Sequence, residues 1–303
     1  MEILGNNRTN EHVIRRELRT YPGDLFSKTN IMRSLRELAA LGYFNPETLG
    51  INPVPNVSDG TVKLQYTVEE KSADQLELSA GWGAGMFVGT LGVKFANFSV
   101  QRLFKKEAWR PIPSGDGQSL SIHWSTNGTQ YQSLNFSFVE PWLGGRKPTS
   151  LSLSFLYSKY DYSKFLWNPS DDYFKIIGGA VGIGTRLQWP DDYFTIYGEV
   201  SYQHFVLRNW RDEFIFSNGR TNNLSLKLVW GRNSVDQPIY PRSGSNFSLS
   251  LQLTPPYSKF NGKDYSSPDM QPNERYKWIE YHKWTAKAQW YAALWGDLVL
   301  FLN

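Results

Sequence analysis

From Gln75 onward, apolar and polar positions along the chain alternate with a period of two. The first such run places Leu, Leu, Ala and Trp at the even positions from Leu76 to Trp82. The alternation recurs at 119–124, 133–138, 151–157, 224–230 and 247–253. Successive side chains of a strand point to opposite faces of the sheet, so the pattern predicts β-strands. We expect about ten strands of about 9 to 14 residues, with an eleventh that begins at Leu298.

The composition of the polar positions bears on the kind of sheet. A soluble β-sandwich also has alternating strands, but they average only about 5 to 6 residues. Here the polar face consists mostly of Ser, Thr, Asn, Gln and Gly, which suits a water-filled lumen. We therefore favour an antiparallel transmembrane β-barrel over a sandwich, and strand number and length also argue against a lipocalin-like binder.

The expected connections fall into two sets. If the first strand leads away from the N-terminal region, the inside connections are 98–117, 141–148, 189–192, 234–244 and 295–297. The outside connections are then 84–86, 126–130, 161–173, 208–221 and 255–279. Bacterial barrels have short periplasmic turns and longer external loops; the later connections follow this rule well, whereas the segment 98–117 does not.

Tryptophans gather at the ends of the expected strands. The proposed membrane-interface aromatics on the inside are Trp142, Trp189, Trp230 and Trp295, and Trp82 and Trp124 lie near outside ends. Indole rings favour the membrane–water interface, so we interpret the two groups as two aromatic belts. The alternative is that these rings only pack against the turns.

Residues 1–72 have a different pattern, which predicts a small α+β domain. We expect a strand at 2–4, a helix capped by Thr9 or Asn10 that runs to about Arg19, and a second helix capped by Ser27. The second helix carries an apolar stripe and ends at Gly42. An extended segment at 51–57, a turn at 59–60 and an alternating strand to Glu69 complete the domain.

Composition and charge narrow the classes of function. The 303 residues contain no Cys, 16% are aromatic, the net charge is +4 and the mean hydropathy is −0.46. No uncharged apolar run is long enough for a transmembrane helix, and the first residues lack the features of a signal peptide. No basic cluster is interleaved with stacking aromatics, so nucleic acid is not an expected partner.

The sequence offers little catalytic chemistry. The four His residues are scattered and none has a metal-ligand partner at a typical spacing. The pairs Asp171–Asp172 and Asp191–Asp192 lie in expected connections, where turn chemistry favours Asp. The glycines from Gly178 to Gly184 lie within a strand, which indicates close packing or flexibility and not a phosphate loop. We therefore expect no enzyme activity, no catalytic residue, no metal and no cofactor.

Several segments resemble the BamA family of outer-membrane assembly factors in its Bacteroidetes-type form. The N-terminal zone resembles the last POTRA domain before the barrel, through Gly5–Thr9, Val13–Leu18, Pro22–Gly23 and Leu41–Phe44. Val68–Glu70 resembles the junction with the barrel, Glu140–Gly145 the turn after strand four, and Asp236, Pro241 and Gly244 the turn after strand eight. Trp109–Pro111 and Ser114–Gly117 resemble the longer second connection of that form.

The resemblance implies a domain organisation and a location. Residues 1–72 are expected to form a POTRA-like periplasmic domain, and 73–303 the N-terminal part of an outer-membrane β-barrel. The resemblance implies sixteen strands, of which about 10–11 are expected here, so we expect a piece of a longer protein. It places the barrel in the bacterial outer membrane.

The resemblance also implies a function: the folding and insertion of β-barrel proteins into the outer membrane. A strand without a neighbour is costly in lipid, and an incoming chain can pair with it by strand addition. The expected template is the first barrel strand, with Gln75, Leu76, Glu77, Leu78, Ser79, Ala80, Gly81 and Trp82 as substrate-pairing residues. Its small residues make the strand easy to peel or twist, unless the glycines only serve a tight turn.

Partners and competing functions follow from the same resemblance. The implied partners are unfolded outer-membrane proteins, accessory BAM lipoproteins, and outer-membrane lipid and lipopolysaccharide. A basic helical surface, comprising Arg15, Arg16, Arg19, Arg33 and Arg36, either docks such lipoproteins or is simply solvated. The alternative function is a POTRA–barrel secretion translocator of the two-partner or TamA-like type. A passive porin would not need the N-terminal domain.

Overall fold

The computed structural model describes residues 1–83, 86–109, 112–161, 172–210, 216–237, 240–296 and 298–302. The chain forms two compact units, which are described separately. The first comprises Met1–Glu77 with Gly92–Ser121, and the second comprises Leu78–Leu91 with Ile122–Asn303. The first unit therefore contains the predicted α+β domain and also the long connection expected at 98–117.

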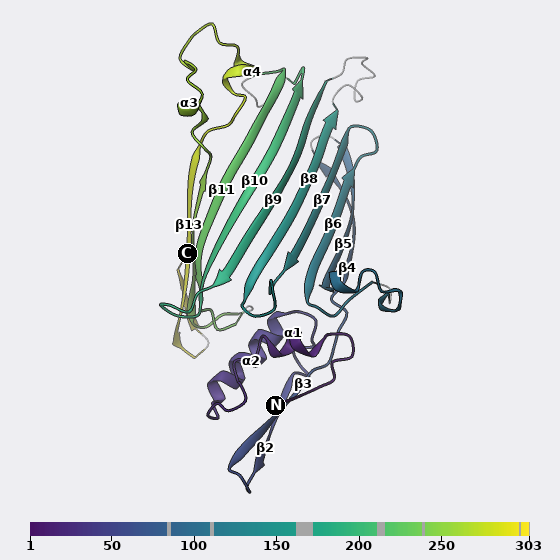
Figure 1. Ribbon diagram of the computed structural model, residues 1–303, viewed down its shortest axis with the longest axis vertical. Helices are drawn as coiled ribbons and strands as arrows, with labels where there is room; N and C mark the ends of the chain where they lie inside the picture. Colours follow the sequence, from purple (N-terminus) through teal and green to yellow (C-terminus); the bar gives the residue numbers. More distant parts are fainter. Residues whose placement is uncertain are drawn as a thin grey trace. The chain divides into compact units, whose positions relative to one another are not determined.

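Residues 1–72 form a three-stranded sheet and two helices (Figure 1). β1 (Glu2–Leu4) pairs in parallel with β3 (Thr61–Thr67), and β2 (Gly50–Asn56) pairs antiparallel with the other side of β3. β2 is therefore an edge strand, and it carries Pro53 and Pro55. Proline removes backbone donors, which limits further pairing at an edge. The strand order confirms the predicted α+β domain.

The two helices contribute their apolar faces to the core of this domain. α1 is Glu11–Arg15 and α2 is Lys28–Ala40. The buried cluster comprises Val13, Ile14, Leu18, Ile31, Leu38, Tyr43, Phe44, Leu64, Tyr66 and Val68. The one polar atom of Tyr66 is satisfied, because its hydroxyl lies 2.9 Å from Thr20 Oγ1. The apolar stripe predicted for the second helix therefore faces the core.

The first helix is shorter than predicted, since it ends at Arg15 and not near Arg19. The chain leaves the helix because Leu18 is buried in the core and the Arg19 amide donates to Ser34 Oγ at 2.8 Å. Asn10 occupies the N-cap position, but its side chain makes no capping hydrogen bond. Ser27 caps α2 as predicted, since its hydroxyl accepts from the Asn30 amide at 3.3 Å.

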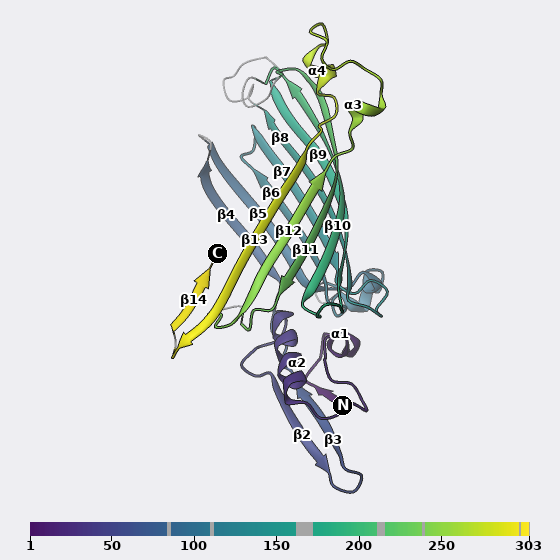
Figure 2. The ribbon, with the colours of Figure 1, turned by 90° about the vertical axis from the view of Figure 1, so that its left-hand side faces the viewer.

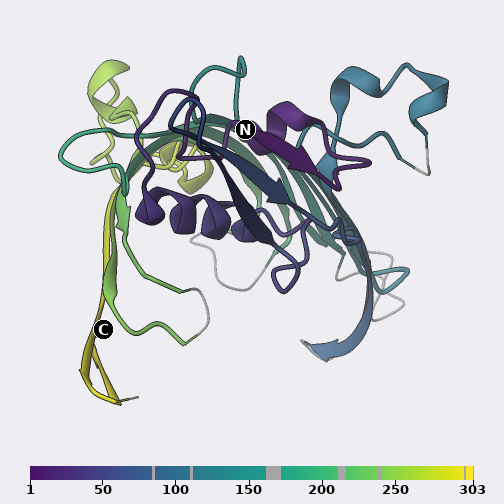
Figure 3. The ribbon, with the colours of Figure 1, turned by 90° about the horizontal axis from the view of Figure 1, so that it is seen from below.

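The remaining strands form one antiparallel sheet of 11 strands in sequence order. They are β4 (Gln75–Gly83), β5 (Met86–Phe98), β6 (Gln118–Thr126), β7 (Tyr131–Glu140), β8 (Thr149–Asp161), β9 (Tyr173–Arg186), β10 (Phe194–Arg208), β11 (Gly219–Asn233), β12 (Gly244–Leu253), β13 (His282–Trp295) and β14 (Leu298–Leu302). The number of strands and the start of the last at Leu298 confirm the prediction. In the second unit the strands tilt together and curve into a wall (Figures 1, 2 and 3).

In the described residues after Gln75, helices occur only in the connections between strands, and they are short. η1 (Val100–Arg102) and η2 (Lys106–Ala108) lie in the connection from β5 to β6, and α3 (Tyr257–Phe260) and α4 (Pro272–Arg275) in that from β12 to β13. No helix in the described part of the chain has the length and apolar character needed to cross a bilayer.

The two faces of the wall show the opposite of the arrangement in a soluble protein, in which apolar side chains are buried and polar ones are exposed. On β11 the apolar side chains of Leu226, Leu228 and Trp230 are each about 40% exposed, at 40%, 41% and 41%. The polar side chains of Asn223 and Ser225 on the other face are buried, at 9% and 1%. Apolar groups outside and polar groups inside are the pattern of a strand that faces lipid.

The glycines of β9 make room for large side chains on neighbouring strands. A Cβ at Gly182 would lie 2.1 Å from the hydroxyl oxygen of Tyr197, and a Cβ at Gly178 would lie 2.9 Å from Gln203 Cγ. The Tyr197 hydroxyl itself hydrogen-bonds Ser152 at 2.8 Å and Glu199 at 2.6 Å. Close packing therefore accounts for this glycine-rich strand.

Candidate functional site

β4 lies at one end of the sheet order, so among the described residues its only neighbouring strand is β5. Every residue from Gln75 to Trp82 is exposed, and Leu76, Leu78 and Trp82 are 74%, 82% and 76% exposed. An edge strand presents backbone N–H and C=O groups along one side, where another chain can pair. The sheet order therefore places the eight predicted pairing residues on an edge strand; their pairing with a substrate remains a prediction.

Gly81 lies near the end of this strand, and nothing in the described residues around it requires a glycine. Gly81 is not in the left-handed region, and no atom lies within 4 Å of a Cβ built on it. Neither a turn conformation nor crowding therefore requires glycine at this position. Glycine makes a strand more flexible and gives it no side chain to pack, which suits a strand that peels or twists.

The tryptophans predicted for the membrane interface occupy strand ends or turns. Trp142 and Trp189 lie in the connections after β7 and β9, Trp230 lies near the end of β11, and Trp295 ends β13. Trp189 and Trp295 are 82% and 88% exposed. Because successive strands are antiparallel, the ends of β7, β9, β11 and β13 lie on the side of the sheet where β4 begins, and so do these four tryptophans. The pattern fits an aromatic belt, and contact with lipid remains a prediction.

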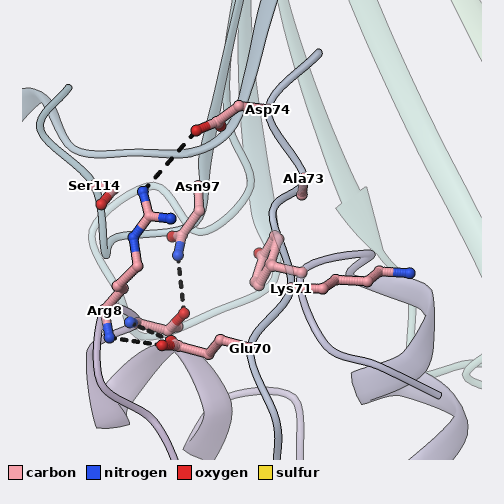
Figure 4. A pocket seen from close by; sticks show the side chains of 9 residues that line it. Arg8, Glu70, Lys71, Ala73, Asp74, Asn97 and Ser114 are labelled. Atoms are coloured by element: carbon pink, nitrogen blue, oxygen red, sulfur yellow. Dashed lines mark hydrogen bonds and ion pairs between the residues drawn. The ribbon is translucent and has the colours of Figure 1, made fainter. Parts of the chain in front are cut away.

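A second arrangement of functional interest lies within the first unit, where the N-terminal loop meets the carboxylate of Glu70. The backbone N–H groups of Asn7, Arg8 and Thr9 donate to this carboxylate at 3.0, 2.7 and 2.6 Å. Figure 4 shows Arg8 beside Glu70 with the hydrogen bond between them. Partial burial alone would raise the pKa of Glu70, but the hydrogen bonds from Thr9, Arg8 and Asn7 outweigh it and lower the pKa below its ordinary value. Glu70 therefore holds the 7–9 loop as an anion.

The connection from β5 to β6 continues this network through Asp116, which is only 8% exposed. Its Oδ1 accepts a hydrogen bond from Asn10 Nδ2 at 2.6 Å, and its Oδ2 accepts from the Ser99 hydroxyl. The Asp116 carbonyl accepts from Arg16 Nη2 at 3.2 Å. Asn10 is held further by Arg102, whose Nη2 donates to Asn10 Oδ1 at 2.6 Å. Asp116 thus ties the connection to the start of α1.

Asn97, at the end of β5, bridges the two parts of this network. Its Nδ2 donates to Thr9 Oγ1 at 2.8 Å, and its Oδ1 accepts from the Gly117 amide at 2.8 Å. A Cβ at Gly117 would lie 2.9 Å from the Tyr43 hydroxyl and 3.0 Å from Val13 Cγ1, so only glycine allows this close approach. We call Thr9, Asn10, Glu70, Asn97, Asp116 and Gly117 the junction network.

The junction network corrects two sequence-based expectations. Asn10 does not cap α1 with its side chain, because Asp116 and Arg102 occupy both of its polar atoms. Arg16 does not belong to a solvated basic surface, since its side chain is only 8% exposed and reaches the Asp116 carbonyl. Arg19 and Arg33 both lie near Glu37, at 3.1 and 3.7 Å. That surface is therefore less cationic than the sequence suggests.

The sequence pattern alone did not indicate roles for the carboxylates of Glu70 and Asp116. Both lie in segments that carried the family resemblance, Val68–Glu70 and Ser114–Gly117. An acidic residue between two glycines is a local sign of a tight, specifically bonded connection. Nothing in the sequence pattern indicated that its partners lie about 100 residues earlier in the chain, as the 106-residue separation of Asn10 and Asp116 shows.

The candidate catalytic groups do not assemble into a site in the described part of the chain. No group of three or more His, Cys, Asp or Glu side chains there has the geometry to hold a metal. Asp191 braces the turn after β9, since its Oδ2 accepts from Arg232 Nε and Nη2 at 3.0 and 2.9 Å. Asp171 lies outside the described residues.

These features define a class of protein: an α+β domain of POTRA type followed by a wall of membrane-spanning β-strands with lipid-facing apolar side chains. Family models agree with this assignment in both parts of the chain. Residues 1–71 match the POTRA model, described as a surface antigen variable number repeat, and residues 114–302 match the Omp85 superfamily domain.

Curated relatives include two proteins of the same kind. The chain is 26% identical over 279 residues to the outer membrane protein assembly factor BamA of Neisseria meningitidis, covering 86% of this chain and 32% of that protein. It is 26% identical over 259 residues to a putative outer membrane protein assembly factor of Treponema pallidum, covering 75% and 28%. The chain thus spans about a third of the length of these relatives, or slightly less.

Solved structures share the fold. BamA from Haemophilus ducreyi lacking POTRA domains 1–3 superposes with a TM-score of 0.56 at 20% identity, covering 96% of this chain and 50% of that one. CdiB from Escherichia coli superposes with a TM-score of 0.57 at 9% identity, also covering 96% and 50%.

The chain belongs to the Omp85 superfamily. Its sequence and fold are those of the BamA-like POTRA–barrel proteins, which confirms the resemblance and the predicted fold class. Proteins of this kind reside in the bacterial outer membrane with the POTRA domain in the periplasm, and so does this chain. The connections that follow β5, β7, β9, β11 and β13 therefore lie on the periplasmic side.

Proposed function

We propose that this protein folds and inserts other β-barrel proteins into the outer membrane, with β4 as the pairing template. The position of β4, the first strand after the POTRA domain and the end strand of the described sheet order, carries the proposal. In lipid, the unpaired backbone groups of a strand edge are costly, so an incoming strand that pairs with them is strongly stabilised. No catalytic side chain is needed, because the stabilisation comes from backbone hydrogen bonds.

The partners proposed for this activity are unfolded outer-membrane proteins as substrates and accessory lipoproteins at the POTRA domain. Outer-membrane lipid and lipopolysaccharide surround the wall of strands. Similarity to the two assembly factors favours these partners, because both align over three quarters or more of this chain.

Cysteine crosslinking in membranes tests the template role. Leu78→Cys is expected to crosslink to a cysteine in the terminal strand of a substrate barrel stalled during assembly. The matched control is Leu228→Cys, at an exposed apolar position of β11 that pairs with Gly198 on one side and Leu251 on the other. Since that strand has both neighbours, it should give no substrate crosslink. Crosslinks from Leu78→Cys confined to the protein's own last strand would refute the template role.

A POTRA–barrel secretion translocator is the second candidate function, and the fold shared with CdiB suits both. The same experiment separates them. A translocator would crosslink to a transported chain that contacts the inner, polar face of the sheet, and not to a terminal barrel strand at the β4 edge.

A further inference from the structure

The periplasmic turn between β7 and β8, residues 141–148, combines exposed apolar and cationic side chains. Leu143 is 44% exposed, and the adjoining Arg146 and Lys147 are both exposed. Gly144 and Gly145 have φ angles of +76° and +71°, so two consecutive left-handed residues reverse the chain here. The turn is fixed by hydrogen bonds from the Leu143 amide to the Thr149 carbonyl at 2.7 Å and from the Gly145 amide to the Trp142 carbonyl at 2.8 Å.

The two cations of this turn differ from the other arginines on the same side of the wall. Arg232 is paired with Asp191, and Arg242 donates to the Gly296 carbonyl. By contrast, within the described ranges the side chains of Arg146 and Lys147 have no hydrogen bond or ion pair. Two adjacent positive charges therefore have no counter-charge among the described residues.

The position of the turn determines what lies next to these charges. Trp142 and Leu143 directly follow β7, which ends at Glu140, and their connection lies on the same side of the sheet as Trp189, Trp230 and Trp295. Apolar side chains are stable at the boundary between headgroups and acyl chains, and cations beside them attract the phosphate groups of anionic lipid.

We propose that the turn 141–148 binds the phosphate headgroup of an anionic phospholipid in the periplasmic leaflet. Arg146 and Lys147 contact the phosphate, and Leu143 with Trp142 anchors the turn among the upper acyl groups. The site holds the periplasmic end of β7 and β8 at a fixed depth in the membrane. The inference rests on the outer-membrane location and is independent of the template role of β4.

The test uses the full-length protein in lipid nanodiscs of phosphatidylcholine with increasing fractions of phosphatidylglycerol. Native mass spectrometry of the released protein measures how strongly phosphatidylglycerol is retained over phosphatidylcholine. A basic residue near an anionic surface contributes about fivefold, so Arg146→Gln/Lys147→Gln should reduce this preference by about 25-fold at low salt. Leu143→Ser should also weaken retention, whereas Arg146→Lys should preserve most of it.

The matched control is Lys259→Gln/Lys277→Gln, which removes the same charge from exposed positions in the external loop between β12 and β13. This control should keep the phosphatidylglycerol preference. An equal loss in both double variants, or no loss in either, would overturn the proposal. Wild-type protein whose preference does not fall with rising salt would overturn it as well, because exposed charges are screened within about 8 Å at physiological ionic strength.

Discussion

The side-chain amide of Asn10 donates a hydrogen bond of 2.6 Å to the carboxylate of Asp116, a residue 106 positions later in the sequence. The bond joins the loop before α1 to the connection between β5 and β6. Because Asp116 is buried, hydrogen bonds from Asn10 and Ser99 satisfy its carboxylate oxygens in place of water. The POTRA domain therefore does not only precede the first barrel strands; it is hydrogen-bonded to the segment that joins β5 and β6.

Replacement of Asp116 should loosen the junction network. Asp116→Ala leaves the fully buried hydroxyl of Ser99 without its acceptor, and an unsatisfied buried polar group costs about 1–3 kcal/mol. Hydrogen–deuterium exchange of the full-length protein should show faster exchange at the amides of Asn10 and Gly117. Asp269→Asn, an exposed residue of the external loop, is the control and should change neither amide. Unchanged exchange in Asp116→Ala would show that the connection is held by other contacts.

The Glu70 carboxylate should make the 7–9 loop sensitive to acid. Its pKa in the folded protein is lowered by hydrogen bonds from Thr9, Arg8 and Asn7 that outweigh the opposing effect of burial. Glu70 therefore contributes stability above the ordinary Glu pKa of about 4.3, and this is lost as the pH falls through the lower folded value.

Exchange protection of the Asn7, Arg8 and Thr9 amides, corrected for intrinsic pH effects, should thus decline below about pH 4.3. In Glu70→Gln the protection should be weaker at neutral pH and should lose this pH dependence. If wild type and Glu70→Gln show the same acid profile, another group controls the loop.

Gly182 should not tolerate a side chain. A Cβ there would lie 2.1 Å from the Tyr197 hydroxyl oxygen, and overpacking of this kind costs about 1–3 kcal/mol. Gly182→Ala should lower the temperature at which the folded barrel loses its compact mobility in gel electrophoresis. The control Gly198→Ala should have little effect, since the nearest atom to its Cβ would be Leu228 Cδ2 at 3.5 Å. Tyr197→Ala should rescue part of the loss; a drop of equal size in both glycine variants would contradict the packing explanation.

The fold was largely predictable because its signals are periodic. Alternation from Leu76 to Trp82 and in the later strands fixed the strands and their faces, and the apolar stripe from Ile31 to Leu38 fixed the second helix. The end of α1 was not predictable, because burial of Leu18 and the bond to Ser34 override a helical pattern that continues to Arg19.

The functional residues were predictable only in part. The family resemblance made Gln75–Trp82, as the first barrel strand, a candidate for substrate pairing, and the tryptophans at strand ends were visible in the sequence. The junction network was not, because its bonds join residues such as Asn97 and Thr9 that are 88 positions apart. Local patterns contain no information on such pairs.

A cysteine scan of β4 tests the central claim most directly. Single cysteines from Gln75 to Trp82 would be crosslinked in membranes to one cysteine in the terminal strand of a stalled substrate barrel. Paired strands keep a fixed register, and side chains alternate between faces with a period of two. The account predicts substrate crosslinks that peak at alternate positions and shift by two residues when the substrate cysteine moves by two. Crosslinks without this period, or only to the protein's own last strand, would contradict it.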